Sequence, residues 1–281
     1  MKVVYTEKSQ VLASRTAQKL GCKISEVKYT TFPDGEQYVR ILDDDDQMII
    51  VSSTVDSKST LQAILLLDAC EGKDTTLVLP YMGYARQDKK FNDGEPISAR
   101  AMARALSSGA DRVITVNIHE SSVLSHFRCP VKNLSLAPEI GKYIQTMDLE
   151  DPLILSPDEG AGEFAKIIAS VGKWESDHLD KTRLSGSEVV MAPKHLDANG
   201  RDCIIVDDII ATGGSMAKAA GMLMEQGATS VRAAGVHGVF ASGGYVKLMA
   251  AGLADIASSD TIERAASKFS ASGIIADAVR K

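Results

Sequence analysis

The stretch CIIVDDIIATGGS, Cys203–Ser215, decides the fold of this 281-residue chain. It begins with the apolar run Cys203–Val206, which predicts a strand that is buried on both faces. The segment MAKAAGMLMEQ, Met216–Gln226, follows it and predicts a helix. A strand that passes through a glycine turn into a helix is typical of a parallel α/β sheet. Ligands of such sheets bind beyond the carboxyl ends of the strands.

The turn between this strand and this helix has the composition of an anion-binding loop. Gly213 and Gly214 permit backbone conformations in which main-chain N–H groups face an anion. The hydroxyls of Thr212 and Ser215 can donate hydrogen bonds, and the N-terminus of the helix adds its partial positive charge. The turn therefore predicts a phosphate site.

Two acids, Asp207 and Asp208, precede this turn. Their carboxylates would repel a phosphate, but they can accept hydrogen bonds from sugar hydroxyls or face a magnesium ion. A Ser-capped helix at the end of an acidic strand is the plainer interpretation, and two adjacent acids exceed what capping requires. The loop and the two acids together predict a sugar-phosphate site.

The alternation of short apolar runs with amphipathic stretches occupies the rest of the chain. Strands are predicted at Met48–Ser52, Thr75–Leu79, Arg112–Ile118, Pro152–Leu155, Glu188–Met191, Cys203–Val206 and Ser230–Val236. Helices are predicted at Ser59–Ala69, Ile97–Ser107, Glu163–Ser170, Met216–Gln226 and Ser272–Val279. We therefore predict an α/β fold of two similar domains, residues 1–142 and 143–281, each a mostly parallel sheet flanked by helices.

The composition argues against several classes of protein. The net charge is -6 and there is no basic stripe, so we expect no nucleic-acid partner. No apolar run reaches the length of about 18 residues that a membrane helix needs, and the N-terminus lacks an apolar signal core. We therefore expect no membrane partner and a cytoplasmic location. The four scattered cysteines are expected to be reduced thiols, and the acidic run Asp43–Asp46 a solvated turn.

Three further segments carry polar residues of particular chemistry. They are FPDGE at Phe32–Glu36, YARQDK at Tyr84–Lys89 and EPISA at Glu95–Ala99. In the first, Phe32 offers a flat apolar face for a purine, and Asp34 and Glu36 offer acceptors. In the second, Arg86 suits a polyphosphate and Gln87 suits a base edge. Taken alone, FPDGE favours a surface turn, and YARQDK is equally compatible with a solvated loop.

Together with the phosphate loop, these segments resemble the ribose-phosphate pyrophosphokinase family over essentially the whole chain. The loop itself resembles the phosphoribosyl-binding motif of the type I phosphoribosyltransferase fold, and transferases of that fold lack the FPDGE and YARQDK pair. The resemblance implies transfer of the β,γ-diphosphoryl group of Mg–ATP to the anomeric hydroxyl of ribose 5-phosphate. The products would be AMP and 5-phosphoribosyl 1-diphosphate. Two alternatives are a phosphoribosyltransferase, which would consume this product, and a non-catalytic, synthetase-like regulatory subunit.

The resemblance also implies the residues that hold the two substrates. The ATP site would be lined by Phe32, Asp34, Gly35, Glu36, Arg86, Gln87 and Asp88. Ribose 5-phosphate would be held by Arg183, Asp207, Asp208, Ala211, Thr212, Gly213, Gly214 and Ser215. In the family the FPDGE loop comes from a neighbouring subunit, which implies a homo-oligomer. Many members carry an acid where this chain has Ala211, so one ribose contact is expected to be lost.

Two residues are implied as magnesium contacts. His119 follows the predicted strand Arg112–Ile118, and Asp158 lies in the segment SPDEG after the predicted strand Pro152–Leu155. A lone histidine is more often structural than a ligand. The family resemblance nevertheless implies that His119 and Asp158 face the Mg²⁺ of Mg–ATP, with water and ATP oxygens as most of its ligands.

The polar segment Lys173–Ser187 predicts a mobile loop or a solvated hairpin. It resembles the flexible catalytic loop of the family, in which Lys181 and Arg183 match a Lys-x-Arg pair. Attack of the anomeric hydroxyl on the β-phosphorus of ATP spreads negative charge over the phosphoryl and leaving oxygens. Two preorganised cations at Lys181 and Arg183 would stabilise that charge.

Overall fold

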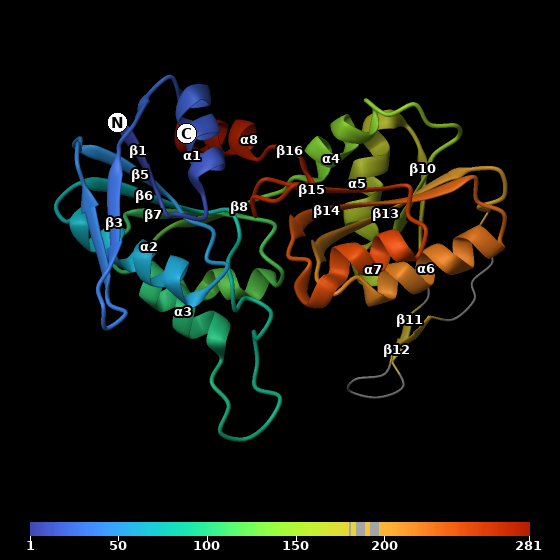
Figure 1. The fold of residues 1–281 in the computed structure, drawn as a ribbon, viewed down its shortest axis with the longest axis horizontal. Helices are drawn as coiled ribbons and strands as arrows, with labels where there is room; N and C mark the ends of the chain where they lie inside the picture. The colour runs from blue at the N-terminus through green and yellow to red at the C-terminus, as the bar shows by residue number, and fades with distance from the viewer. Residues whose placement is uncertain (180, 184–188, 192–196) are drawn as a thin grey trace. The chain divides into compact units, whose positions relative to one another are not determined.

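Two parallel six-stranded sheets, one in each of two units, organise the fold (Figure 1). The computed structural model describes residues 1–179, 181–183, 189–191 and 197–281, with the backbone alone for 181–183 and 189–191. The first unit comprises Met1–Ser135, Asp260–Glu263 and Ser270–Lys281, and the second comprises Leu136–Ser259 and Arg264–Phe269. These units differ from the predicted domains 1–142 and 143–281 chiefly because the last helix of the chain belongs to the first unit.

The sheet of the first unit has the order β2-β1-β5-β6-β7-β8, and all its strands are parallel. Its strands are β1 (Lys2–Tyr5), β2 (Lys23–Ile24), β5 (Gln47–Val51), β6 (Asp74–Leu79), β7 (Arg112–Val116) and β8 (Val131–Leu134). Its helices are α1 (Gln10–Leu20), α2 (Ser57–Ala69), α3 (Ser98–Leu106), η1 (Ser121–His126) and α8 (Ser272–Val279). The central strands are buried along most of their length, as apolar runs without polar alternation predict.

The sheet of the second unit has the order β10-β9-β13-β14-β15-β16 and is also parallel throughout. Its strands are β9 (Leu153–Ser156), β10 (Glu175–His178), β13 (Asp202–Ile210), β14 (Ser230–Gly238), β15 (Asp255–Ser259) and β16 (Ser267–Phe269). Its helices are α4 (Ala137–Ile144), η2 (Glu159–Ala161), α5 (Gly162–Gly172), α6 (Gly214–Glu225), η3 (Ala241–Gly243) and α7 (Gly244–Ala250). The predicted fold class, parallel sheets flanked by helices, is confirmed.

Two antiparallel hairpins extend from the units. One joins β3 (Val27–Thr31) to β4 (Gln37–Ile41), and the other joins β11 (Lys181–Arg183) to β12 (Val189–Met191). The second hairpin corrects the strand predicted at Glu188–Met191, because Val189–Met191 pairs with β11 and not with the parallel sheet. Glu188 lies outside the described residues.

Two further predictions need correction. The strand predicted at Cys203–Val206 continues to Ile210, because β13 pairs with β14 up to its last residue. Asp207 and Asp208 therefore lie within the strand and not after it. The segment predicted as a loop or hairpin at Lys173–Ser187 contains a sheet strand, β10, as well as the hairpin strand β11. β10 is an edge strand with polar side chains, which leaves no apolar run to detect in the sequence.

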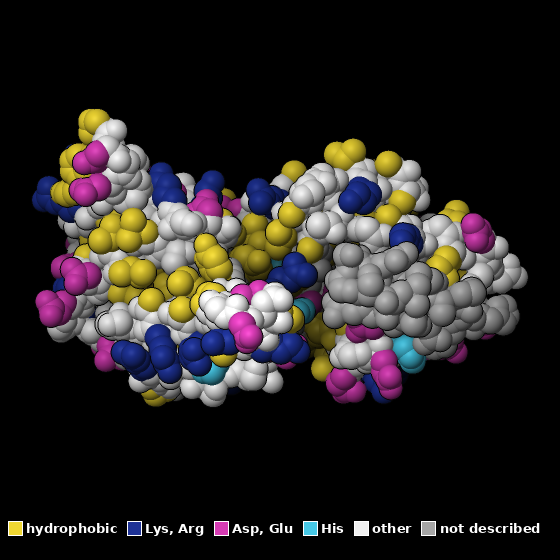
Figure 2. Space-filling model, turned by 90° about the horizontal axis from the view of Figure 1, so that it is seen from below, with side chains coloured by type: hydrophobic (Ala, Val, Ile, Leu, Met, Phe, Trp, Pro, Cys, Tyr) yellow, Lys and Arg dark blue, Asp and Glu magenta, His cyan; other side chains and the backbone are white. Residues whose placement is uncertain are grey.

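The surface of the protein mixes hydrophobic and charged side chains, and the acidic run of the sequence is exposed on it. Figure 2 shows hydrophobic side chains exposed on both units among charged ones. The predicted solvated turn at Asp43–Asp46 is confirmed, and its carboxylates pair with Lys2, Lys73 and the N-terminal amine. None of the helices in the described part of the chain combines the length and the apolarity needed to cross a membrane.

A buried carboxylate anchors the C-terminal segment to the first unit. Asp260 is 1% exposed, accepts a hydrogen bond from the Ala271 N–H at 2.9 Å and pairs with Arg15 at 2.6 Å. In the same short segment, Glu263 accepts a hydrogen bond at 2.9 Å from the Leu12 N–H in the first turn of α1. Residues 260–263 therefore fasten the segment that leads to α8 onto α1.

We predict that Asp260→Ala lowers the free energy of unfolding by about 1–3 kcal/mol, because the Ala271 N–H would lose its buried partner. Asp260→Asn keeps one acceptor and is expected to cost less. Urea unfolding of both variants measures these losses. Asp277→Ala is the control, since its carboxylate pairs with Arg280 on the surface and such pairs contribute little. A loss no larger than that of the control would contradict the anchoring role.

Candidate active site

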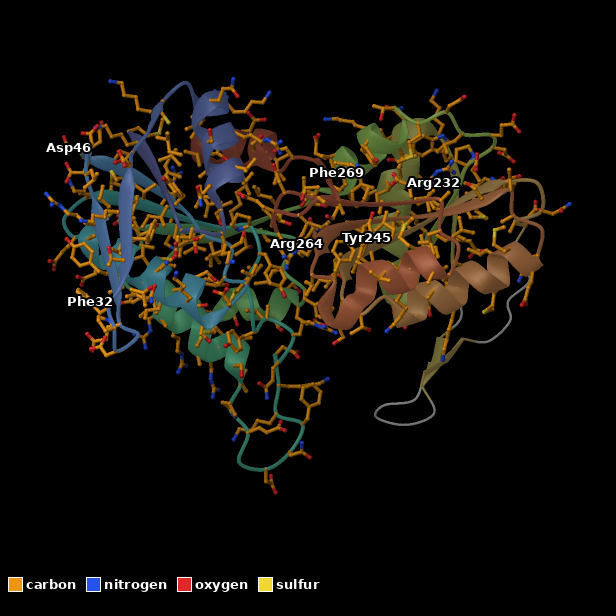
Figure 3. The ribbon with its side chains drawn as sticks, viewed as in Figure 1. Phe32, Asp46, Arg232, Tyr245, Arg264 and Phe269 are labelled. Carbon is orange, nitrogen blue, oxygen red and sulfur yellow. The ribbon has the colours of Figure 1, made fainter. Side chains whose placement is uncertain are left out.

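The segment FPDGE forms the tip of the β3–β4 hairpin. The Phe32 N–H donates to the Glu36 carbonyl at 2.8 Å, and the Gly35 N–H donates to the Phe32 carbonyl at 2.9 Å. Gly35 has a φ of 96°, which glycine adopts without strain. Figure 3 labels Phe32 at the free end of the hairpin, where its ring is 46% exposed and packs edge-on against Tyr38. Asp34 and Glu36 are exposed beside it, so the hairpin presents a ring and two carboxylates to solvent.

The YARQDK loop begins where the backbone of Gly83 lies close to that of Thr54. The Gly83 N–H donates to the Thr54 hydroxyl oxygen at 2.9 Å, and a Cβ at Gly83 would lie 2.2 Å from the Thr54 carbonyl oxygen. Position 83 therefore requires glycine. Tyr84 follows with a φ of 65°, an uncommon value for a residue with a side chain. The Gln87 N–H donates back to the Tyr84 carbonyl at 3.2 Å, which closes a turn over residues 84–87 and leaves Arg86 exposed within it.

The start of α3 holds Gln87 in place. The Ser98 hydroxyl donates to the side-chain carbonyl of Gln87, and the Ala99 N–H donates to its main-chain carbonyl at 3.2 Å. Asp88 is half-buried next to it, whereas Arg86 is exposed. The loop therefore leaves a guanidinium available to an anion while its neighbour Gln87 is fixed.

Glu95 of the EPISA segment organises the rest of this loop. Its carboxylate accepts hydrogen bonds from the N–H groups of Phe91 at 2.8 Å and Asn92 at 3.1 Å, and from the Asn92 side chain at 2.6 Å. These hydrogen bonds, with that of the Asn92 side chain contributing most, hold the pKa of Glu95 below its usual value. The loop is thus folded around a carboxylate that stays ionised.

A small apolar cluster lies beneath both Arg86 and His119. We call it the α3 cluster, and it consists of Met82, Ala85, Ala99, Ala103, Ile118 and Val123. Ala85 precedes Arg86, and Ile118 precedes His119. Because both of these anchors are buried in one cluster, the exposed residues that follow them are held by the same part of the first unit.

In the second unit, the phosphate loop packs against the start of α7. Gly213 has a φ of 70°, and a Cβ there would lie 2.9 Å from the Gly244 carbonyl oxygen. A Cβ at Gly244 would lie 2.7 Å from the Ala211 carbonyl oxygen. Both positions therefore require glycine. No side chain of the described residues caps the N-terminus of α6 at Gly213, so its first N–H groups suit an anion.

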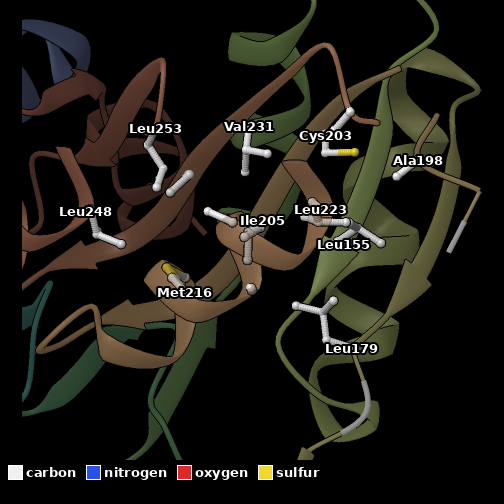
Figure 4. Packing of buried hydrophobic residues seen from close by; sticks show 14 of the residues in the cluster. Leu155, Leu179, Ala198, Cys203, Ile205, Met216, Leu223, Val231, Leu248 and Leu253 are labelled. Carbon is white, nitrogen blue, oxygen red and sulfur yellow. The ribbon is translucent and has the colours of Figure 1, made fainter. Parts of the chain in front are cut away.

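Figure 4 shows the buried side chains that support this loop. Ile205 comes from β13, Met216 and Leu223 from α6, and Leu248 from α7. All four are at most 4% exposed. The strand before the loop and the helices beside it therefore share one close-packed core, which keeps the loop backbone in place. Thr212 is exposed above this core, and Ser215 is half-buried.

Three carboxylates of the second unit lie close to this loop. Loss of hydration raises the pKa of Asp207 well above its usual value; the neighbouring charge of Asp208 raises it further, and Asp158 adds to the effect. The Asp208 N–H donates to the Asp207 carboxylate at 2.9 Å. Asp158 comes after β9, which pairs in parallel with β13, so both strands end at the same edge of the sheet. This edge favours a cation or a hydroxyl donor.

The Lys-x-Arg pair lies on the β11–β12 hairpin. Lys181 pairs in register with Met191, and Arg183 pairs with Val189. The side chains of Lys181 and Arg183 lie outside the described part of the structure. The chain reaches this hairpin from β10 through Leu179, whose N–H donates to the carbonyl of Ser156 at the end of β9 at 2.9 Å. The hairpin therefore starts beside the segment that contains Asp158.

The structure brings together part of the predicted site within each unit. In the first unit, Arg86 and His119 follow anchors in the α3 cluster. In the second, Asp158, Asp207 and Asp208 interact electrostatically. His119 and Asp158 belong to different units, and the described residues contain no group of three or more His, Cys, Asp or Glu that could hold a metal ion. Their joint contact with Mg²⁺ stays a prediction.

Sequence reasoning did not single out Gly83 or Gly244. The glycine at position 83 directly precedes YARQDK, which is a usable signal in the sequence. Gly244 offers no comparable signal, because its close approach to Ala211 arises from the packing of α7 on the loop.

Comparison with known proteins decides the family. Residues 1–109 match the family model of the N-terminal domain of ribose phosphate pyrophosphokinase, and residues 137–246 match that of the phosphoribosyl transferase domain. A ribose-phosphate pyrophosphokinase of Methanosarcina mazei is 47% identical over 282 residues, which cover 99% of this chain and 95% of the relative. The chain belongs to the ribose-phosphate pyrophosphokinase family.

Other ribose-phosphate pyrophosphokinases agree over nearly the full length. That of Methanopyrus kandleri is 41% identical and covers 99% of this chain and 98% of its own. The enzyme of Halobacterium salinarum is 42% identical, and the match covers 96% of this chain and 98% of that enzyme. The crystal structure of phosphoribosylpyrophosphate synthetase from Mycobacterium smegmatis matches with a TM-score of 0.84 at 27% identity, over 99% of this chain and 97% of that one. The predicted family is confirmed.

We predict that Asp207→Asn stabilises the protein without ligands. Because the pKa of Asp207 is raised in the folded state, the folded protein binds the proton more tightly than the unfolded chain does. The stability of the unsubstituted protein should therefore fall, relative to that of the variant, as the pH rises from about 4, the ordinary range of an aspartate, through the raised pKa. Thermal unfolding of both proteins at several pH values measures this difference.

Asp255→Asn is a suitable control, because this residue lies at the opposite end of the same sheet. Its substitution should not reproduce the pH dependence. A variant at position 207 that is less stable than the unsubstituted protein at every pH would contradict the electrostatic argument.

Proposed function

We propose that this protein transfers the β,γ-diphosphoryl group of Mg–ATP to the anomeric hydroxyl of ribose 5-phosphate, with AMP and 5-phosphoribosyl 1-diphosphate as products. The observation that carries the proposal is the full-length similarity to ribose-phosphate pyrophosphokinases. The presence of the FPDGE hairpin and the phosphate loop in one chain supports it.

Ribose 5-phosphate binds at the phosphate loop in this proposal. The N–H groups at the start of α6 and the hydroxyls of Thr212 and Ser215 receive its phosphate, because they are donors at a helix N-terminus. Asp207 and Asp208 accept hydrogen bonds from the sugar hydroxyls, which offset the repulsion between the two carboxylates. Ala211 contributes its backbone alone, so the sugar has one side-chain contact fewer than in relatives with an acid at this position.

ATP binds to residues that the first unit exposes. Arg86 pairs with the phosphates, and Gln87 and Asp88 lie next to it on the same loop. The adenine contacts the hairpin tip of a second copy of the chain. There Gly35 forms the turn, and the contacts come from Phe32, Asp34 and Glu36. The Phe32 ring is 46% exposed at this tip and is thus accessible to a second copy.

The carboxylate of Asp158 after β9 suits magnesium. Mg²⁺ binds through one or two protein groups, substrate phosphates and water, and oxygen is its preferred ligand. Asp158 offers oxygen in a region that the neighbouring carboxylates make negative, and His119 is exposed at the end of β7. When bound, the ion neutralises charge on the phosphates of ATP. His119 and Asp158 would hold it.

The transfer itself requires positive charge where the phosphoryl oxygens become more negative. The anomeric oxygen attacks the β-phosphorus, the bond between the α-phosphate oxygen and the β-phosphorus breaks, and AMP leaves with the bonding electrons. Lys181 and Arg183 supply two cations from the β11–β12 hairpin, and Arg183 also contacts ribose 5-phosphate. Such preorganised charges act most strongly where water is excluded.

The decisive experiment is an assay of the purified chain with magnesium, ATP and ribose 5-phosphate. We expect AMP and 5-phosphoribosyl 1-diphosphate in equal amounts, both dependent on ribose 5-phosphate. ADP in place of AMP would mean transfer of the γ-phosphoryl group and would overturn the proposed chemistry. Absence of both products, with consumption of 5-phosphoribosyl 1-diphosphate when a base is added, would favour a phosphoribosyltransferase. Absence of all turnover would favour a regulatory subunit.

We predict that Lys181→Ala lowers turnover by about 10²–10³-fold, because a positioned charge would be lost from the transition state. The midpoint of thermal unfolding should change little. Lys166→Ala is the matched control, since Lys166 is an exposed residue of α5 in the same unit. Turnover of the Lys181 variant equal to that of this control would remove the residue from the mechanism.

A further inference from the structure

The chain turns sharply after β7, just before His119. Asn117 has a φ of 41°, in the left-handed region that asparagine enters more readily than most residues. Its N–H donates to the Leu134 carbonyl on β8 at 2.8 Å. The turn is therefore held by the neighbouring strand, and His119 follows it by two residues.

The side chain of Asn133, also on β8, holds the next part of this turn. Its Oδ1 accepts a hydrogen bond from the Thr115 hydroxyl at 2.9 Å and another from the Ile118 N–H at 3.1 Å. A main-chain N–H can only donate, so the atom that faces Ile118 must be the carbonyl oxygen of the amide. Both acceptor positions of this oxygen are used, one on β7 and one on the turn that follows it.

The two donors belong to buried residues, whereas Asn133 itself is exposed. Thr115 is 1% exposed and Ile118 is 9% exposed. The side chain of Ile118 is buried in the α3 cluster, while its N–H is bound by Asn133. Packing holds the side chain of Ile118 and a hydrogen bond holds its backbone. The exposed His119 is the next residue in the chain.

We infer that Asn133 is a positioning residue for His119. By accepting the Ile118 N–H, its Oδ1 fixes the backbone from which the imidazole extends toward Mg–ATP. The inference rests on the proposed function only in taking Mg–ATP as the ligand that His119 meets. The hydrogen bonds of Asn133 themselves do not depend on that function.

Substitution of Asn133 tests the inference. Asn133→Leu removes the acceptor and leaves the Ile118 N–H unpaired, and Asn133→Ser is a milder variant whose short hydroxyl cannot reach both donors. Asn133→Asp keeps an acceptor oxygen at the same distance from the backbone, so it should retain both hydrogen bonds and bind Mg–ATP like the unsubstituted protein. We expect the dissociation constant of Mg–ATP, measured by calorimetry, to rise about tenfold in the leucine variant. The KM for ribose 5-phosphate should stay the same.

A double-mutant cycle separates positioning from general stability. In a His119→Ala background, Asn133→Leu should have no further effect on the binding of Mg–ATP, because the group that it positions is absent. Lys132→Ala is the matched control, as an exposed neighbour on the same strand. An effect of the same size with and without His119 would overturn the inference, and so would unchanged binding in Asn133→Leu.

The position of the His119 imidazole can also be tested by NMR on the protein without ligands, which does not depend on the proposed function. The imidazole resonances of His119, assigned by their loss in His119→Ala, should shift in Asn133→Leu and Asn133→Ser but not in Asn133→Asp or Lys132→Ala. Unshifted resonances in folded Asn133→Leu and Asn133→Ser would overturn the inference even if the enzyme makes AMP. Shifted resonances in a chain without turnover would support the inference and contradict the function.

Discussion

One electrostatic constraint stands out in the second unit, the half-buried Asp207 carboxylate that β13 places beside Asp208. Parallel pairing with β14 carries this strand beyond its apolar part, so its two acids lie within the strand, at the carboxyl edge of the sheet. Loss of hydration and the charges of Asp208 and Asp158 all oppose ionisation of Asp207. A folded chain keeps such an arrangement when function requires it, and a ligand that donates hydrogen bonds or carries positive charge relieves it.

In the first unit, apolar packing fixes the backbone of the candidate site residues. These residues come from segments far apart in the chain, and each needs an exposed side chain on a fixed backbone. The α3 cluster provides this, because Ala85 and Ile118 are buried one residue before Arg86 and His119. The hairpin tip is instead held by its own hydrogen bonds and by the contact of Phe32 with Tyr38, and the Phe32 ring stays 46% exposed.

The fold and part of the site could be predicted because their signals are local. Apolar runs without alternation correctly indicated parallel strands, and the turn at Thr212–Ser215 correctly indicated the start of a helix, whose role in anion binding stays a prediction. The edge strand β10 was missed because Glu175–His178 is polar. The length of β13 was underestimated because pairing with β14, and not the composition of Asp207–Ile210, carries the strand to its end.

The sequence by itself therefore determined the fold class and the family, and it predicted the phosphate loop, since each has its signal in short stretches of neighbouring residues. Only the tertiary structure decided how the loop between β7 and His119 is held by Asn133, and how Asp260 fastens the C-terminal segment to α1. These contacts join different elements of the fold, across 11 to 245 positions of the chain. A single polar residue such as Asn133 or Asp260 gives no periodic signal, and its partner is defined only when the strands are in register.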